Sequence, residues 1–221
     1  SGVRKALDTK KVGHAGTLDP AATGLLVMGV GAGTRLLTYL VGLDKSYTAT
    51  LRLGYETTTD DAEGEKVGET STDLGSVSDD AIRAALEPFR GEIDQVPSTY
   101  SAIKVEGKRA YDLARSGQEV ELRSRRVTVS HLDAPSITRG EDVIDVELVV
   151  DCSSGTYIRA LARDIGRALG VGGHLVALRR TRVGPFGVEG TPTPQEVEES
   201  HLLGLAQVAG QIMPVVTLSK T

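Results

Sequence analysis

The stretch "DVIDVELVVDCSSGTYIRALARDIGRALG", residues 142–170, places an alternating apolar segment directly before a helical one. In its first part, every second residue is apolar, which is typical of a strand with one buried face: Ile144, Val146, Leu148 and Val150. From Thr156 the apolar residues follow helical spacing, and a glycine at or near Gly170 can end the helix. The apolar stripe of this helix is Ile158, Leu161, Ala162, Ile165 and Leu169. The stretch therefore predicts a half-buried strand followed by an amphipathic helix.

Further strands and helices surround this unit without a steady strand–helix alternation. Residues 47–54 alternate in the same way, and residues 24–31, 125–134 and 174–186 also read as strands. Short helices are predicted around 34–43 and after Ser78, which can cap a helix whose apolar positions are Ile82, Ala85, Leu86 and Phe89. The polar residues 56–76 read as a mobile excursion. We therefore predict an α+β fold with a mixed, mostly antiparallel sheet.

Length and composition are those of a soluble globular protein. The 221 residues suit one large domain, or one domain with an appendage, and 39% of them are hydrophobic. No apolar run is long enough for a membrane-spanning helix, and residues 1–11 lack the apolar block of a secretory signal. The single cysteine, Cys152, excludes an internal disulfide framework. We expect a cytoplasmic monomer that does not contact membranes.

The net charge of −5 hides an uneven distribution. Residues 56–94 hold 12 acidic against 3 basic residues, whereas residues 1–55, 101–126 and 152–182 carry net charges of +4, +3 and +5. Folding could gather the three basic segments on one face that attracts nucleic acid. The alternative is that these charges are simply a solvated surface.

Common cofactor and metal motifs fail in this sequence. The dinucleotide fingerprint would need glycine where Thr34 stands, and no Walker Gly-Lys-Ser/Thr occurs. The four histidines are scattered, so we predict no metal site, and we also predict no cofactor. Without a nucleophile-elbow motif, and with Cys152 inside a predicted strand, hydrolase chemistry is not indicated.

The stretch "VGHAGTLDP", residues 12–20, holds one carboxylate among residues that restrict the backbone. Pro20 disfavours the helical conformation at Asp19, while Gly13 and Gly16 permit turns. Asp and Gly are also ordinary turn residues, so these residue types alone indicate a turn. A functional carboxylate is the second interpretation.

Four separated stretches together resemble the pseudouridine synthases that modify the T-arm of tRNA. They are "GHAGTLDPAATGLL" (13–26), "KSYTATLRLG" (45–54), "DCSSGTYIRALARDIG" (151–166) and "HLVALRRTRVG" (174–184). "TTTDDAEGE" and "VPSTYSAIKVEGKRAYDLAR" are similar to the bacterial members, the TruB-type enzymes. The resemblance covers roughly residues 10 to 187. It implies a catalytic domain over 1–190 with an RNA-gripping thumb at about 100–122, and the start of a C-terminal RNA-binding region over 191–221. The family's usual N-terminal strand and Asp-Lys-Pro segment are missing, so we expect a trimmed chain.

The resemblance also assigns roles to individual residues. It makes Asp19 the catalyst and Arg159 its ionic partner, with Tyr47, Leu178 and His14 around the target base. The implied RNA contacts are Lys104, Lys108, Arg109 and Arg115 of the thumb and Arg179, Arg180 and Arg182 beside the pocket strand. From the residues alone, other roles stay open: core packing for Tyr47 and Leu178, loop capping for His14, and for Arg159 a solvated place on the helix one turn from Arg163.

The implied reaction is the isomerisation of uridine 55 in the tRNA T-loop to pseudouridine. The N1–ribose bond breaks and a bond from carbon 5 to the ribose forms, with no redox change. The base must first leave its stack, at a cost of a few kcal/mol that backbone contacts offset. Two rivals remain: a guide-RNA-dependent pseudouridine synthase subunit, and a tRNA-folding protein in which catalysis is secondary.

Overall fold

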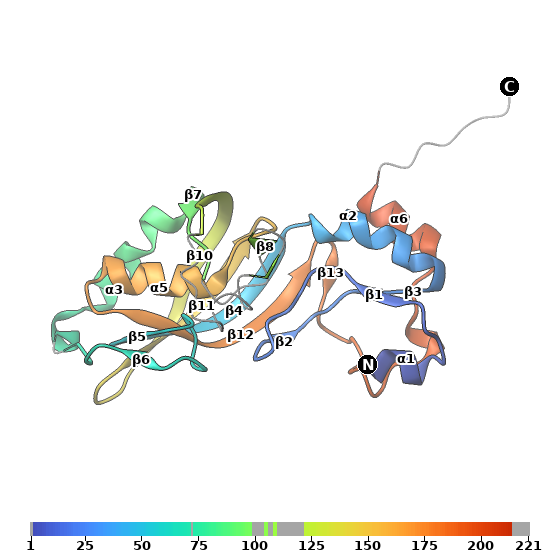
Figure 1. The fold of residues 1–221 in the computed structure, drawn as a ribbon. Coiled ribbons are helices and arrows are strands. Elements are labelled where there is room, and N and C mark those ends of the chain that lie inside the picture. Colours follow the sequence, from blue (N-terminus) through green and yellow to red (C-terminus); the bar gives the residue numbers. More distant parts are fainter. Residues whose placement is uncertain (1, 72, 99–103, 106–107, 110–121, 214–221) are drawn as a thin grey trace, which may run out of the picture. The chain divides into compact units, whose positions relative to one another are not determined.

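The computed structural model describes residues 2–71, 73–98, 104–105, 108–109 and 122–213 (Figure 1). The chain divides into two compact units, which we describe separately. The first unit comprises Ser1–Ser46 and Arg179–Thr221, and the second comprises Tyr47–Leu178. This division does not follow the predicted boundary at residue 191, which stays a prediction.

The second unit is built on an extended sheet. Its strands follow the order β12 (Gly173–Val183), β4 (Lys45–Leu53), β11 (Ile144–Cys152), β10 (Arg125–Arg139) and β7 (Gly91–Gln95). Of β12 and β4, the second unit contains residues 173–178 and 47–53, and the other residues of these two strands belong to the first unit. Strand β10 pairs antiparallel with both β11 and β7, and its register against β11 shifts twice. The predicted α+β class with a mostly antiparallel sheet is confirmed.

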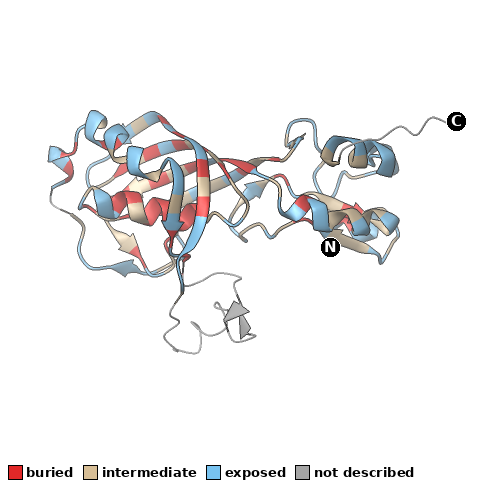
Figure 2. Cartoon of the chain, turned by 90° about the horizontal axis from the view of Figure 1, so that it is seen from above, coloured by how far each residue is buried: buried red, intermediate tan, exposed pale blue. Residues whose placement is uncertain are grey.

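One apolar cluster forms the core of this unit. The predicted inward faces of β4 and β11 are buried, and Figure 2 shows buried residues along these strands and along α5 (Ile158–Ala168). Helix α3 (Asp79–Ala85) adds Ile82 to the same cluster, and its predicted cap is confirmed because Ala81 N donates to Ser78 Oγ over 3.1 Å. Burial of each large side chain contributes about 1.5–3 kcal/mol. The alternation and helical spacing read from the sequence therefore located the core correctly.

The acidic segment after β4 is attached to the sheet. Strand β5 (Glu56–Thr57) pairs with β6 (Lys66–Val67), and Leu175 N donates to Asp60 O over 2.9 Å. The prediction of a mobile excursion over 56–76 is therefore wrong for its first half. The remaining small elements of this unit are η2 (Leu74–Ser76), η3 (Glu87–Phe89), β8 (Lys104–Val105) and β9 (Lys108–Arg109).

The first unit contains short elements. Strand β1 (Val12–His14) pairs antiparallel with β3 (Met28–Val30), whereas β2 (Thr23–Gly24) pairs in parallel with the end of β12. The single buried strand predicted over 24–31 is therefore wrong: residues 25–27 separate two strands with different partners. The other elements are α1 (Gly2–Ala6), η1 (Gly31–Leu36), α2 (Leu37–Val41), β13 (Phe186–Gly187), η4 (Glu199–His201) and α6 (Leu205–Ile212). Over the part of the chain described here, no helix is long and apolar enough to span a membrane.

His174 on β12 links the pH of the solution to the stability of the second unit. The residue is 2% exposed, its ring lies 4.6 Å from the ring of Tyr55, and its Nδ1 lies 3.1 Å from Tyr55 O. Burial lowers the pKa of His174. In the unfolded chain this histidine has a pKa of about 6.5, so below that pH the unfolded chain binds a proton more readily than the folded chain does. The free energy of unfolding therefore falls as the pH drops from about 6.5 towards the lowered pKa of the folded state.

We expect His174→Gln to flatten this dependence, whatever its effect at neutral pH. The slope lost is at most about 1.4 kcal/mol per pH unit, which is the limit for one proton. Urea unfolding followed by circular dichroism between neutral and mildly acidic pH measures it. Equal slopes in the wild type and the variant would contradict the assignment to His174.

Candidate functional site

Asp19 lies at the first position of a tight turn in the first unit. Ala22 N donates to Asp19 O over 2.9 Å, which closes a turn with Pro20 in second place. Proline favours this place because its ring fixes the backbone angle that the turn requires. The turn interpretation is confirmed for the backbone, and the half-buried Asp19 side chain sits at its start. The catalytic role of Asp19 stays a prediction.

His14 ends β1 on the same unit, at the beginning of the loop that carries Asp19. It is exposed, and its Nδ1 lies 3.2 Å from Gly16 O. Gly16 has a φ of +85°, a left-handed conformation that glycine adopts without steric cost. The contact supports the alternative interpretation, in which His14 caps the loop. The prediction that His14 lies near the target base of the RNA stays a prediction.

The loop carrying Asp19 closes on the end of β12. Thr23 and Gly24 pair with Arg179 and Arg180, and Leu25 N donates to Arg180 O over 2.7 Å. Gly24 has a φ of +99°, and an added Cβ would meet Arg180 O at 2.2 Å, so only glycine fits. The sequence therefore places a glycine where two backbone segments touch.

Arg179 and Arg180, two of the three arginines of β12, have different surroundings. Arg179 is exposed, with Nη1 3.5 Å from Thr23 Oγ1, and it remains a candidate RNA contact. Arg180 is only 1% exposed, and its guanidinium donates to the carbonyl oxygens of Leu25 and Thr17. The burial of its guanidinium corrects the prediction that Arg180 grips RNA, because a side chain enclosed by its own chain cannot reach a phosphate.

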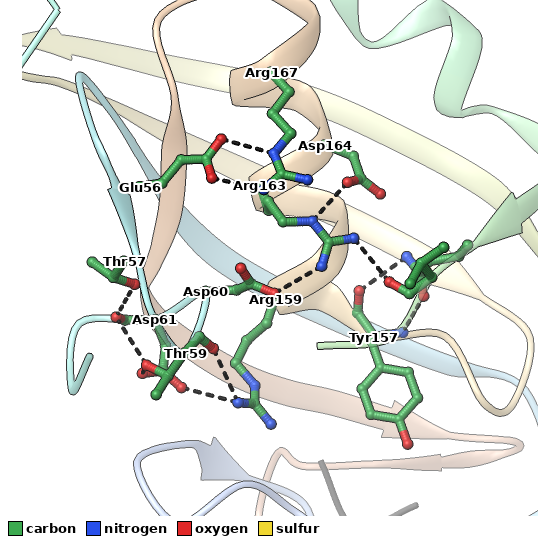
Figure 3. Close-up of polar contacts among 12 residues, drawn as sticks. Glu56, Thr57, Thr59, Asp60, Asp61, Tyr157, Arg159, Arg163, Asp164 and Arg167 are labelled. Carbon is green, nitrogen blue, oxygen red and sulfur yellow. Dashed lines mark hydrogen bonds and ion pairs between the residues drawn. The ribbon is translucent and has the colours of Figure 1, made fainter. Parts of the chain in front are cut away.

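Arg159 projects from α5 towards the acidic segment of the second unit (Figure 3). Its Nη1 lies 3.2 Å from Asp61 Oδ2 and donates to Thr59 O over 3.2 Å. Arg159 is 7% exposed, so the alternative of a solvated helix residue is wrong. Because Asp19 belongs to the other unit, its predicted pairing with Arg159 stays a prediction.

Asp61 is a residue of the candidate site that the sequence analysis did not single out. Besides Arg159, its carboxylate accepts hydrogen bonds from Thr59 Oγ1 and from Glu63 N, and its backbone forms a bridge with Leu175. These contacts fix the carboxylate, which in turn fixes the guanidinium. The signal in the sequence was the acidic "TTTDDAEGE" stretch, whose partner lies nearly a hundred residues away.

Among the described residues, the Arg159–Asp61 contact is one of three ion pairs that α5 forms with the acidic segment (Figure 3). At four-residue intervals, Arg163 pairs with Asp60 over 2.9 Å and Arg167 pairs with Glu56 over 2.7 Å. Side chains at this spacing share one helix face. The guanidinium of Arg167 lowers the pKa of the Glu56 carboxyl through its hydrogen bonds. Part of the basic 152–182 segment is thus neutralised internally rather than presented to a nucleic acid.

Of the remaining predicted site residues, two pack in the core, and the RNA contacts of the others stay predictions. Tyr47 is 8% exposed within the core cluster and the half-buried Leu178 packs against it, so the core alternative is confirmed for both. Their contact with a target base stays a prediction. Lys104, Lys108 and Arg109 belong to the paired strands β8 and β9, and Arg115 lies outside the described residues. Among the residues that the structure describes, no group of three or more potential ligands is placed to hold a metal.

Two family models match the chain. The first, described as "TruB family pseudouridylate synthase (N terminal domain)", covers residues 4–158. The second, "tRNA pseudouridylate synthase B C-terminal domain", covers residues 159–216.

Curated relatives match nearly the whole chain. A protein named tRNA pseudouridine synthase B from Arthrobacter sp. (strain FB24) is 54% identical over 221 residues, which are 99% of this chain and 72% of the relative. A protein of the same name from Corynebacterium diphtheriae is 51% identical over 223 residues, with 100% of this chain and 74% of the relative covered.

Solved structures share the fold at lower identity. The "Crystal Structure of a Cbf5-Nop10-Gar1 Complex" contains a chain that is 33% identical, with a TM-score of 0.60 over 84% of this chain and 44% of that one. The "Structure of H/ACA RNP bound to a substrate RNA containing 2'-deoxyuridine" gives 30% identity and a TM-score of 0.58, covering 84% and 42%.

Proposed function

Because the chain belongs to the TruB family of pseudouridylate synthases, we propose that it converts uridine 55 in the T-loop of tRNA to pseudouridine. The observation that carries the proposal is the identity of 51–54% to relatives named tRNA pseudouridine synthase B over essentially the whole chain. The turn at Asp19 and the contacts of Arg159 agree with it: a backbone hydrogen bond closes the turn, and Asp61 and Thr59 hold the guanidinium.

Asp19 is the proposed catalyst of bond cleavage. A carboxylate can attack the ribose or the base covalently, or it can remove a ribose proton. The N1–C1′ bond then breaks, the detached uracil turns and C5 bonds to C1′. The carboxylate leaves its covalent adduct, or returns the ribose proton that it took, and the C5 proton leaves while N1 gains one. Arg159 is the proposed ionic partner of this carboxylate, because a guanidinium stays charged on burial.

The other predicted side chains accommodate the base and the RNA. Tyr47 would offer a ring face to uracil and Leu178 an apolar wall, while His14 would lie beside the extruded nucleotide. Arg179 and the thumb residues Lys104, Lys108, Arg109 and Arg115 would contact phosphates, which makes binding dependent on salt. Recognition of the T-arm would then rest on its shape.

The second candidate is a guide-RNA-dependent subunit, which the resemblance to chains from Cbf5 complexes favours. Two observations weigh against it: the identity to these chains is 30–33%, against 51–54% to the tRNA enzymes, and the second family model is that of the tRNA enzymes. We therefore propose a cytoplasmic enzyme that acts as a monomer on tRNA alone.

The test is incubation of the purified chain with an unmodified tRNA transcript, followed by mapping of pseudouridine along the RNA. We expect one modified position, uridine 55, and none in a matched transcript with cytidine there. Modification that requires further proteins and a guide RNA would favour the second candidate. Light scattering of the same preparation tests the monomer.

A further inference from the structure

Arg180 binds both ends of the segment that contains Asp19. Its Nη1 donates to Thr17 O over 3.2 Å, and its Nε donates to Leu25 O over 2.8 Å. Its own backbone carbonyl accepts from Leu25 N over 2.7 Å. Thr17 precedes Asp19 by two residues and Leu25 follows the turn, so one residue of β12 spans the loop at its base. All these residues belong to the first unit.

The chemistry of these contacts requires an arginine. Two carbonyl oxygens from different parts of the loop accept from two nitrogens of one planar group, whereas the single ammonium of a lysine has no such fixed geometry. Within the described part of the chain, Nη2 of Arg180 has no hydrogen-bond partner, and no carboxylate pairs with this guanidinium. Enclosing a charge in this way is costly. This unfavourable burial of a charge occurs at the base of the loop that carries Asp19.

We infer that Arg180 is a positioning residue, which holds the Thr17–Leu25 loop so that Asp19 keeps a fixed place. The inference rests on the proposed function and extends it: Arg180 would influence the rate of the reaction and would not contribute to RNA affinity. Gly24 supports it independently, since its backbone meets that of Arg180 too closely for any side chain.

The experiment compares Arg180→Lys and Arg180→Gln with the wild type. Single-turnover reactions on unmodified tRNA measure the rate, and titrations at several salt concentrations measure tRNA binding. We expect the rate at saturating enzyme to fall by about 10–100-fold, since a displacement of about 1 Å in a reacting group costs that much. The tRNA dissociation constant and its salt dependence should stay unchanged. Arg179→Gln, the neighbouring exposed arginine, should instead weaken binding and reduce the salt slope by about one.

Hydrogen exchange gives a readout that does not depend on activity. We expect amides between Thr17 and Leu25 to exchange faster in both Arg180 variants, and amides of β11 to be unaffected. Arg83→Gln, an exposed change on α3, is the control that alters none of these quantities. If wild-type protein is inactive on tRNA, the proposed function fails, while the exchange result still tests the loop. Weaker tRNA binding with an unchanged rate, or unchanged exchange in the loop, would overturn the inference.

Discussion

Asp19→Asn should reduce pseudouridine formation by more than about 10⁴-fold, because asparagine can neither act as a nucleophile nor accept a proton at neutral pH. The amide has nearly the shape of the carboxylate, and the turn at Asp19 depends on backbone groups and Pro20. The loop should therefore keep its structure, and tRNA binding should remain within about threefold of the wild type. Single-turnover kinetics and binding titrations on one tRNA transcript measure both quantities.

The same variant separates an enzyme from a tRNA-folding protein. A protein whose main task is to fold tRNA would support normal growth and normal tRNA folding with asparagine at position 19. We expect tRNA isolated from cells that carry only the variant to lack the modification. A wild-type turnover rate in Asp19→Asn would refute the catalytic assignment outright, and loss of tRNA binding would show that the carboxylate serves structure.

Local patterns in the sequence predicted the core because burial of apolar faces dominates stability. Strands β4 and β11 and the stripe of α5 follow periods of two and 3.6 residues, and a single register buries most of their apolar side chains. The cap at Ser78 is equally local, since its side chain and its partner are three residues apart. Such features need no knowledge of distant segments.

Charged residues were harder to interpret because their partners lie far away in the sequence. Arg163 and Asp60 are 103 positions apart, so the sequence shows only an acidic segment and a basic helix face. Arg180 looks like one of several surface cations until its strand is paired with Gly24. Similarly, the division of residues 24–31 into two strands follows from two separate partners, β12 and β1, and not from hydropathy.

The second large effect concerns stability and arises from the Arg163–Asp60 pair. The two side chains are 9% and 12% exposed, and the guanidinium also donates to Asp164 and to Val96 O. Burial raises the pKa of the Asp60 carboxyl, against the opposing effects of the charge of Arg163 and its hydrogen bond. The carboxylate therefore depends on its partner to remain charged in this environment.

Arg163→Met should destabilise the protein by about 3–5 kcal/mol at neutral pH, because Asp60 then remains buried without a compensating charge. The double variant with Asp60→Asn should recover much of this loss, since a neutral amide needs no counter-ion. Urea unfolding of the wild type, both single variants and the double variant measures the coupling. The exposed pair of Arg126 and Asp94 is a matched control, and Arg126→Met should have a far smaller effect.

The pH dependence of the Arg163→Met deficit identifies its source. A carboxyl group whose pKa is higher in the folded chain than in the unfolded chain binds its proton more tightly in the folded chain. It therefore stabilises the fold at low pH, and this stabilisation is lost as the pH rises through the raised pKa. Removal of Arg163 raises the pKa of Asp60 further, because an attractive charge is lost. The gap between wild type and Arg163→Met should therefore narrow on acidification. Two results together would contradict this explanation: a stability difference between wild type and Arg163→Met that does not change with pH, and a stability of Arg163→Met equal to that of Arg126→Met. Arg163 would then not compensate a buried charge on Asp60.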